Sequence, residues 1–484
     1  MKGIPSRKPN KKYTKPIQFR NCILEFQVMK EKLFNEFSAV SSKQWKQQIQ
    51  YELKGADYNE TLVWESPEGI KVKPFYHCDE DNGTKTSSSQ NHAFKIVQNI
   101  FVFDLEKSIK KANNSLSRGA ESLRFTIENE SIDVDRLLSE IDIKNHTIYL
   151  NLKFLSADFI KKANQIAKAK NTLIYCLVDP IHQLAFDGNW YKAEEKDNFE
   201  ILSSLINECH NVSLININAS LYQNAGANMV QQLAYTLAHA NEYFNKIENY
   251  TKPITTEIAV GTNYFFEIAK IRAFRQLFKA LATEYNYTGE LHIIATPTRR
   301  NKTLYDYNVN MLRTTTECMS AILGGADAVT NLAYDALYHK DNEFGDRISR
   351  NQLLVLKHES YFDIVQNASD GAYYIENLTS QLAEKALTLF KDIEANGGLL
   401  KQLKEGTIQK KIQESAQKEQ DLFDSGKEIL LGTNKYPNKN DRMAGDLELY
   451  PFVKVNPRKT LITPIIEKRL AEKMEQERLA AENQ

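Results

Sequence analysis

Residues 147–178 read TIYLNLKFLSADFIKKANQIAKAKNTLIYCLV, and their pattern indicates the fold class. Two short apolar runs, Thr147–Phe154 and Thr172–Val178, flank a segment at 157–169 whose apolar residues recur at helical spacing. Strands that are largely apolar indicate a parallel sheet covered on both faces. The stretch therefore predicts a strand–helix–strand unit of an α/β protein.

The same alternation continues on both sides of this unit, over residues 93–343. Eight apolar runs are predicted strands: Phe94–Phe103, Ser122–Ile127, Thr147–Phe154, Thr172–Val178, Val212–Ile217, Thr256–Val260, Leu291–Ala295 and Ala328–Leu332. Helices are predicted between them at 105–116, 157–169, 198–208, 227–247, 264–284 and 305–323. Eight such units match a closed (β/α)8 barrel of the TIM type. A doubly wound sheet is the alternative, but its GxGxxG pattern is absent from the sequence.

The chain before the barrel is predicted to lack a core of its own. Residues 1–28 are rich in lysine and arginine, so we expect a disordered tail or a non-native start. An RNA-binding arm or a transit segment is the less favoured alternative. Residues 29–92 are expected to form an N-terminal arm and linker, with helix at 29–55, extended chain at 60–76 and a polar linker at 81–92.

The chain after the barrel, residues 344–484, is predicted to be a C-terminal helical extension. Helical patterns occupy 344–358, 378–396, 407–428 and 465–483. Tyr373 and Tyr374 are expected in a turn before the second of these. Gly324 and Gly325 precede the eighth strand, and we expect them to end a helix, because a phosphate loop would need more glycines ahead of a helix.

The composition excludes several function classes. Lysine plus arginine and aspartate plus glutamate both total 62, so no net charge favours nucleic acid or an anionic membrane as a partner. No apolar run approaches the roughly 18 residues that a membrane-spanning helix needs. Cysteines without a CxxC pair favour reduced thiols in the cytoplasm over disulfides or a structural zinc site. They are Cys22, Cys78, Cys176, Cys209 and Cys318.

Barrel enzymes carry their catalytic groups at the C-terminal ends of the strands. Strand four ends at Asp179 and His182, which we interpret as a structural hydrogen-bonded pair. A glycosidase would need a second carboxylate on strand seven, where the first acid is Asp306. Arg299 and Arg300 are adjacent and should point differently, so a two-arginine clamp on phosphate is not favoured. No catalytic, cofactor-binding or metal-binding residue is therefore predicted on this chain.

Six ordered segments carry a specific set of motifs. They are Trp45–Pro74, Glu267–Leu277 (EIAKIRAFRQL), Arg313–Gly325 (RTTTECMSAILGG), Arg347–Ser360 (RISRNQLLVLKHES), Asp370–Leu389 (DGAYYIENLTSQLAEKALTL) and Leu430–Asn438. Together they resemble the cobalamin-dependent methylmalonyl-CoA mutase family, from near residue 30 to the end of the sequence. That family pairs a substrate barrel with a C-terminal cobalamin domain.

One departure from the family pattern concerns the cofactor. The family's C-terminal domain carries DxHxxG, whose histidine becomes the lower cobalt ligand, and this sequence has no DxHxxG. The resemblance therefore implies no cobalamin-binding Rossmann-like domain on this chain. Adenosylcobalamin is expected in a partner large subunit instead.

Other departures fall on the barrel. Catalytic chains of the family carry YHMQEAGA after strand five, where the histidine can hydrogen-bond the thioester carbonyl. Here Ser220–Ala227 reads SLYQNAGA, which puts Leu221 at the histidine position. The family's SxTSGWS after strand seven reads ATPTRRNK at Ala295–Lys302. The segment that carries a catalytic tyrosine and a CoA-contacting arginine before strand one is missing, and 81–92 stands in its place.

These departures make the resemblance strongest to the small subunit of the family's heterodimeric enzymes. It implies a complex that interconverts (R)-methylmalonyl-CoA and succinyl-CoA by a radical 1,2-rearrangement, with CoA esters bound by the large subunit. This chain would be inactive alone and would contribute assembly and stability. One alternative is the acyl-CoA-binding barrel of a split mutase that borrows a separate cobalamin-binding chain. Another is a scaffold for an unrelated protein.

Three aromatic residues ahead of the barrel are the candidate contacts with a large subunit. They are Trp45, Tyr51 and Trp64, and buried aromatic side chains often anchor interfaces. Packing against the chain's own barrel is an equally good interpretation. If they are contacts, deleting 30–76 should weaken association with the large chain more than it unfolds the barrel.

Overall fold

The computed structural model describes residues 36–80, 93–365, 367–454 and 456–482. They fall into two compact units: residues 36–62 with 76–80, and residues 63–75 with 93–482. The predicted tail at 1–28 and the predicted linker at 81–92 lie outside the described residues. Within the described ranges, every helix is too short or too polar to cross a membrane.

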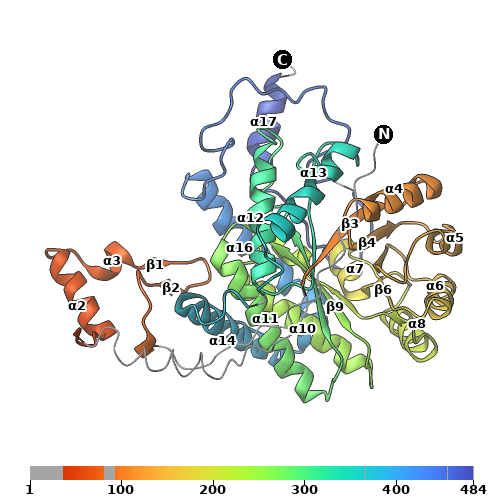
Figure 1. Ribbon diagram of the computed structural model, residues 1–484, viewed down its shortest axis with the longest axis horizontal. Helices are drawn as coiled ribbons and strands as arrows, with labels where there is room; N and C mark the ends of the chain where they lie inside the picture. Colours follow the sequence, from red (N-terminus) through yellow and green to blue (C-terminus); the bar gives the residue numbers. More distant parts are fainter. Residues whose placement is uncertain (1–35, 81–92, 366, 455, 483–484) are drawn as a thin grey trace, which may run out of the picture. The chain divides into compact units, whose positions relative to one another are not determined.

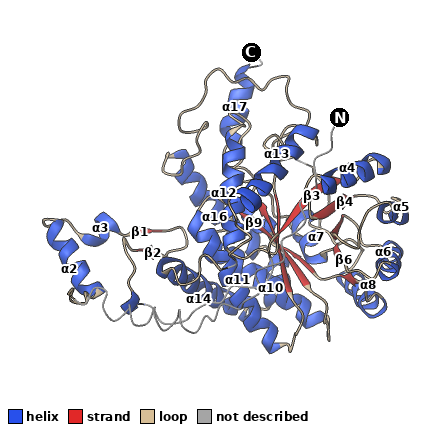
Figure 2. Ribbon diagram, in the orientation of Figure 1, coloured by secondary structure: helices blue, strands red, loops and turns tan. Residues whose placement is uncertain are grey.

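The second unit is built around a ring of parallel strands (Figure 1, Figure 2). The strands are β3 (Lys95–Phe101), β4 (Ser122–Ile127), β5 (Thr147–Leu152), β6 (Ile174–Leu177), β7 (Val212–Ser213), β8 (Asn216–Asn218), β9 (Ile254–Val260), β10 (Leu291–Pro297) and β11 (Ala328–Thr330). Their order is β7-β6-β5-β4-β3-β11-β10-β9-β8. Only Leu214 and Ile215 separate β7 from β8, so these two are halves of one strand and the ring closes. The predicted (β/α)8 barrel is confirmed.

The break in the fifth strand has a local cause. The Tyr250 hydroxyl accepts hydrogen bonds from the backbone N–H groups of Leu214, at 3.0 Å, and Ile215, at 3.4 Å. Ser213 Oγ donates to the carbonyl of Pro253 at 2.6 Å. Side-chain and loop partners thus satisfy buried polar groups that strand pairing would otherwise satisfy.

Helices follow the strands around the outside of the ring (Figure 2). They are α4 (Leu105–Ser117), α5 (Val134–Ser139), α6 (Ala157–Ala169), α7 (Pro180–Asp187), α8 (Glu195–Glu208), α9 (Ser220–Asn224), α10 (Met229–Lys246), α11 (Tyr264–Glu284), α12 (Val309–Leu323) and α13 (Glu343–Leu354). All six predicted barrel helices are present, although α12 begins at Val309 and not at 305. Its end is as predicted, with Gly324 at the C-cap and Gly325 at a φ of +90°.

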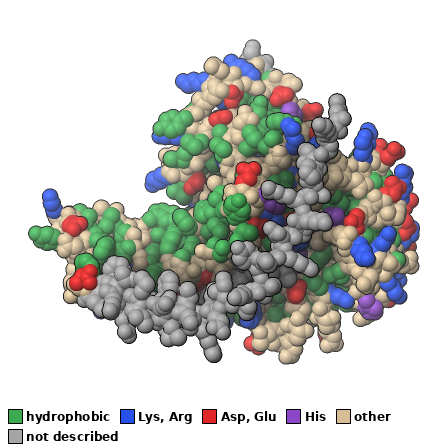
Figure 3. Space-filling model, in the orientation of Figure 1, with side chains coloured by type: hydrophobic (Ala, Val, Ile, Leu, Met, Phe, Trp, Pro, Cys, Tyr) green, Lys and Arg blue, Asp and Glu red, His purple; other side chains and the backbone are tan. Residues whose placement is uncertain are grey.

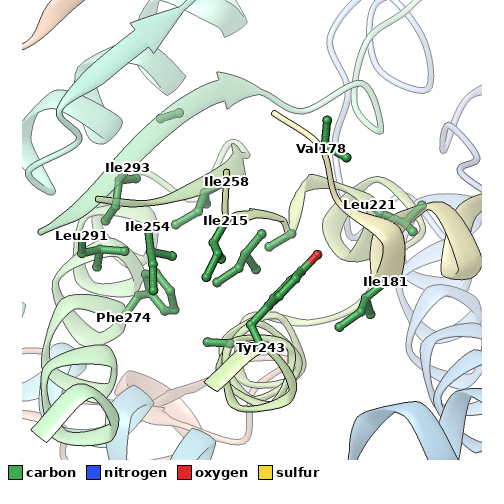
Figure 4. Packing of buried hydrophobic residues seen from close by; sticks show 14 of the residues in the cluster. Val178, Ile181, Ile215, Leu221, Tyr243, Ile254, Ile258, Phe274, Leu291 and Ile293 are labelled. Atoms are coloured by element: carbon green, nitrogen blue, oxygen red, sulfur yellow. The ribbon is translucent and has the colours of Figure 1, made fainter. Parts of the chain in front are cut away.

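The main core lies between the strands and the outer helices. Successive side chains along a strand point to opposite faces, so one face of each strand packs on helices and the other lines the bore. On β9, Ile254 and Ile258 lie in the cluster that also contains Phe274 of α11 (Figure 4). Glu257, between them, belongs to the opposite face. This alternation sends polar side chains into the barrel.

The first unit contains α2 (Ser42–Glu52), α3 (Tyr58–Leu62) and the 3-10 turn η1 (Cys78–Glu80). The helix predicted at 29–55 begins only at Ser42 in the described part of the chain, because Ser41 caps it. The Ser41 hydroxyl accepts from Gln44 N–H at 3.3 Å, and Gln44 Oε1 accepts from Ser41 N–H at 2.8 Å. This reciprocal capping box is a start signal that the apolar spacing alone did not reveal.

The extended stretch predicted at 60–76 is in part a hairpin of the second unit. Its strands β1 (Trp64–Glu65) and β2 (Lys71–Val72) pair antiparallel. The Trp64 ring packs edge-on against Phe266 of α11, with ring centroids 5.8 Å apart, and Ile70 is fully buried. The hairpin therefore packs against the barrel.

Four helices follow the barrel: α14 (Tyr373–Ala395), α15 (Gly398–Lys404), α16 (Thr407–Asp424) and α17 (Glu472–Glu482). A π-helical turn, η2 (Val355–Glu359), continues α13, and α14 lies beside α10 and α11 (Figure 1). Two details were predicted wrongly. Tyr373 and Tyr374 begin α14 and form no separate turn. Residues 465–471 are not helical, because their N–H groups bond elsewhere, as Ile465 N–H does to the Ala185 carbonyl at 2.8 Å.

Candidate functional site at the barrel top

An ion pair crosses the bore of the barrel. Arg124 on β4 pairs with Glu257 on β9, and these strands lie opposite each other in the ring. Their side chains are only 13% and 5% exposed. Asn216 Nδ2 on β8 also donates to Glu257 Oε1, at 2.9 Å. The pair therefore spans the interior between two opposite walls.

Aromatic side chains bridge the bore at a second level. The Tyr149 hydroxyl on β5 lies 2.8 Å from His292 Nε2 on β10, which is again the opposite strand. The Tyr175 ring stacks on the His292 ring, with centroids 4.9 Å apart. Burial lowers the pKa of His292, although the nearby Asp327 carboxylate opposes this change. Side chains thus close the bore at two levels.

Asp179 at the end of β6 is a fully engaged structural carboxylate. It caps α7 by accepting from His182 N–H at 2.9 Å, and it accepts from Asn218 N–H at 2.8 Å. His239 Nε2, at 3.0 Å, and the Tyr243 hydroxyl, at 2.8 Å, also contact it. Burial would raise the pKa of Asp179, but the neighbouring histidines lower it overall. The predicted structural pairing of Asp179 with His182 is confirmed, as a helix cap.

His182 predicts a dependence of stability on pH. Burial lowers its pKa to about 4 in the folded protein, while Asp179 opposes the change. In the unfolded chain histidine titrates near its ordinary value of about 6.5. The unfolded state therefore binds more protons as the pH falls from about 6.5 to 4, and the free energy of unfolding falls over that window. We expect His182→Gln to reduce this fall by about 2–3 kcal/mol.

Urea denaturation at a series of pH values measures this effect. The exposed His210 offers a control, since His210→Gln should leave the pH dependence as it is. Equal pH dependence in the His182→Gln variant and the unsubstituted protein would show that His182 does not stay neutral in the folded state.

Leu221 lies where the motif of catalytic chains has histidine. It is on α9, is 1% exposed, and belongs to the same apolar cluster as Val178 and Ile181 (Figure 4). Its hydrocarbon side chain cannot donate a hydrogen bond. Gly226 of the same motif is retained at a φ of +96°, and a Cβ there would lie 2.5 Å from the Cβ of Ala416. Leu221 therefore provides no proton donor in this loop.

Buried polar contacts hold this loop to α11. Gln223 Nε2 donates to Glu267 Oε1 at 3.1 Å, and Lys270 Nζ donates to Gln223 Oε1 at 2.9 Å. Glu267 Oε1 also accepts from Gly261 N–H at 2.8 Å. Gln223 comes from the SLYQNAGA segment, while Glu267 and Lys270 come from EIAKIRAFRQL. The two motifs are therefore parts of one packed framework.

The two arginines after β10 do not form a clamp. Arg300 is buried, pairs with Glu419 of α16 and donates from Nη1 to the Lys468 carbonyl at 2.8 Å. Arg299 is exposed, and its backbone N–H bonds to Asn224 Oδ1 at 3.0 Å. The guanidinium of Arg300 thus binds residues of the C-terminal extension and is not available to hold a phosphate.

The histidines beside Asp179 do not fit the role of a cobalt ligand. His239 is fully buried, with Nδ1 3.3 Å from the Tyr222 hydroxyl and Nε2 against Asp179. The ring of His182 stacks on Phe186, with centroids 5.7 Å apart, and its Nδ1 lies 3.2 Å from the Asn218 carbonyl. Both imidazoles take part in the barrel's own packing. Among the described residues, no group of three histidine, cysteine or acidic side chains is placed to hold a metal.

The structure separates the three candidate contact residues. Trp45 and Tyr51 lie on α2 in the first unit and are 53% and 81% exposed. Figure 3 shows hydrophobic side chains gathered over α2 and α3. Trp64 is in the second unit, where it packs on Phe266 and remains 49% exposed. Packing against the chain's own barrel thus buries part of the Trp64 side chain.

The bridges across the bore were not predicted from the sequence. The signal was a charged residue in the middle of an apolar run, Arg124 in SLRFTI and Glu257 in ITTEIAV. Such a residue in a strand buried on both faces must point into the bore and find a partner. Which strands would face each other became apparent only from the closed ring.

Comparisons with known proteins agree with the motifs. The family model described as methylmalonyl-CoA mutase matches residues 128–479. The methylmalonyl-CoA mutase small subunit of Porphyromonas gingivalis is 34% identical, over 86% of this chain and 73% of that protein. The methylmalonyl-CoA mutase of Cereibacter sphaeroides is 27% identical, over 81% of this chain and 64% of that protein. The human mitochondrial methylmalonyl-CoA mutase is 26% identical, over 84% of this chain and 60% of that protein.

This chain thus spans less than two thirds of the length of the last two relatives. Among solved structures, the HPPK-DHPS of Plasmodium falciparum aligns with a TM-score of 0.32 and 12% identity, over 70% of this chain and 57% of that chain. The fold assignment rests on the strand pairing described above.

Proposed function

Since this chain belongs to the methylmalonyl-CoA mutase family, we propose that it is the small, non-catalytic subunit of a heterodimeric enzyme. The family consists of cobalamin-dependent isomerases, and the proposed complex interconverts (R)-methylmalonyl-CoA and succinyl-CoA. In this proposal the large subunit binds the CoA ester and adenosylcobalamin, and this chain supplies assembly and stability. A reducing compartment such as the cytoplasm suits its four described cysteines, which are free thiols.

One observation carries the non-catalytic role: Leu221 is buried in the apolar core at the histidine position of YHMQEAGA. A leucine there offers no hydrogen bond to a thioester carbonyl. The filled bore supports the same conclusion. A CoA ester that entered along the barrel axis would have to break the Arg124–Glu257 pair or the contact between Tyr149 and His292.

A turnover assay tests this proposal. Methylmalonyl-CoA isomerisation is followed with adenosylcobalamin present, using this chain alone, the large chain alone, and the two mixed. The proposal expects no turnover from this chain alone and full turnover from the mixture. Turnover by this chain alone that matches the mixture would overturn it.

The partner contact is expected to depend on α2. We predict that Trp45→Ala combined with Tyr51→Ala weakens association with the large chain by at least about tenfold, because exposed aromatic side chains commonly anchor interfaces. The dissociation constant measured by biolayer interferometry checks this. Phe103→Ala is the matched control, since Phe103 is an aromatic residue of the barrel that is 88% exposed. If only the control lost affinity, the contact with the large chain would lie outside α2.

A further inference from the structure

A cavity of about 690 Å³ lies at the C-terminal ends of β8, β9 and β10, and the proposed function does not use it. Its walls come from the β1–β2 hairpin, the loop after β8, the start of α10 and α16. Most of its lining side chains are polar or charged. The wall therefore offers charged and polar groups to a ligand beside apolar surface.

The cavity contains a carboxylate with an unsatisfied oxygen. Glu68, at the tip of the hairpin, accepts from Met229 N–H through Oε1 at 3.3 Å. Its Oε2 is buried and has no hydrogen-bond partner among the described residues. Burial raises the pKa of Glu68, although the Ser66 hydroxyl opposes the rise. A buried carboxylate oxygen without a donor is costly, so a ligand that supplies a donor would be stabilised there.

The charge around this carboxylate is negative overall. The basic side chains of the cavity wall are already paired or exposed: Arg300 pairs with Glu419, Lys411 pairs with Glu414 at 3.0 Å, and Lys418 is exposed.

A second carboxylate of the wall, Glu428, has its pKa raised by burial and by the nearby Glu419. Lys270, next to the cavity, pairs with Glu267 at 2.5 Å. The wall therefore carries more carboxylates than basic side chains.

Trp64 adds an aromatic surface to the same cavity. Its indole lines the wall, touches Phe266 edge-on, and is 49% exposed. An indole face attracts organic cations. A metal ion fits less well, since no group of three potential ligands is placed to hold one among the described residues.

We propose that this cavity binds an ammonium or guanidinium group, which pairs with the Glu68 carboxylate and lies against Trp64. Two sources share this chemistry, a lysine or arginine side chain of another protein and a free polyamine. The cavity and its binding groups belong to this chain alone, and only the test for a protein source uses the proposed large chain.

Fluorine NMR of the full chain labelled with 5-fluorotryptophan tests the proposal. The three tryptophans give one signal each, assigned by single Trp→Phe variants. Spermidine and arginine methyl ester are the probes, with potassium chloride at matched ionic strength as the reference. We expect both probes to shift the Trp64 signal saturably and to leave the Trp45 and Trp190 signals in place.

Substitutions locate the binding group. Glu68→Gln keeps the size and removes the charge, and we expect at least about tenfold weaker binding. Glu65→Gln is the matched control, because Glu65 is exposed on the same hairpin and does not line the cavity. If Glu68→Gln moves the Trp64 signal before any probe is added, the hairpin has shifted. Glu428→Gln, which changes a second carboxylate of the cavity wall, then supplies the charge test.

The outcomes distinguish a polyamine from a protein side chain, and they also test whether the cavity binds a cation at all. Tight spermidine binding with weak binding of the arginine ester supports a polyamine. Weak binding of both probes, together with weaker capture of a large chain by the Glu68→Gln variant, supports a protein side chain. A Trp64 signal that responds to neither probe overturns the proposal, as do equal affinities of the Glu68→Gln, Glu428→Gln and unsubstituted proteins.

Discussion

Asp179→Ala is expected to lower the free energy of unfolding by about 3–5 kcal/mol. Asp179 is buried and meets two backbone N–H groups, the Tyr243 hydroxyl and His239 Nε2. Alanine would leave these groups in the core without an acceptor, and each buried unpaired donor costs about 1–3 kcal/mol. The α7 cap would be lost as well. Urea denaturation followed by circular dichroism measures the change.

Two further substitutions test whether the loss of stability comes from the hydrogen bonds of Asp179. Asp179→Asn keeps an acceptor for the helix cap and should lose less stability than alanine. Asp158→Ala, at an exposed position in the first turn of α6, should stay within about 0.5 kcal/mol of the unsubstituted protein. If Asp179→Ala were no worse than Asp158→Ala, the hydrogen bonds around Asp179 would not be contributing stability.

The second large effect concerns the ion pair across the bore. Arg124→Met and Glu257→Leu should each destabilise the protein by about 3–5 kcal/mol, because each leaves a buried charge without its partner. The double variant replaces both charges with apolar groups of similar volume, and it should be close to the unsubstituted protein in stability. The expected pattern is therefore strongly non-additive.

A double-mutant cycle in urea denaturation checks this pattern. The exposed pair Lys161–Glu208, with side chains 42% and 49% exposed, is the matched control and should show no measurable coupling. Additive losses at Arg124 and Glu257 would mean that the two side chains do not hold each other across the barrel.

The strands and long helices of the barrel could be predicted because their apolar patterns are local. The short helices α5, α7 and α9 have five to eight residues, too few for a period to show. The break at Leu214 depends on Tyr250, which lies in a different loop. The start of α2 depends on the capping pair Ser41 and Gln44. Contacts made by single side chains thus set the details that periodicity missed.

The candidate site could be predicted to a similar extent. The motif predicted Leu221 after strand five, and the structure adds that its side chain is buried. Asp179 was paired with His182 because they are neighbours in sequence, whereas His239 and Tyr243 reach it from α10. The sequence offers no spacing rule for such partners. The motifs therefore locate the loop after strand five, and only the closed ring reveals which side chains fill the bore.

In the proposed function, this barrel does not bind the substrate of its family. Calorimetric titration of the isolated full chain with methylmalonyl-CoA tests it most directly, with the heterodimer as the positive control. We expect no saturable binding to the isolated chain up to about 1 mM, a range that covers most enzyme–substrate affinities. Saturable binding as tight as that of the heterodimer would contradict it and would favour a split mutase whose barrel still takes the acyl-CoA.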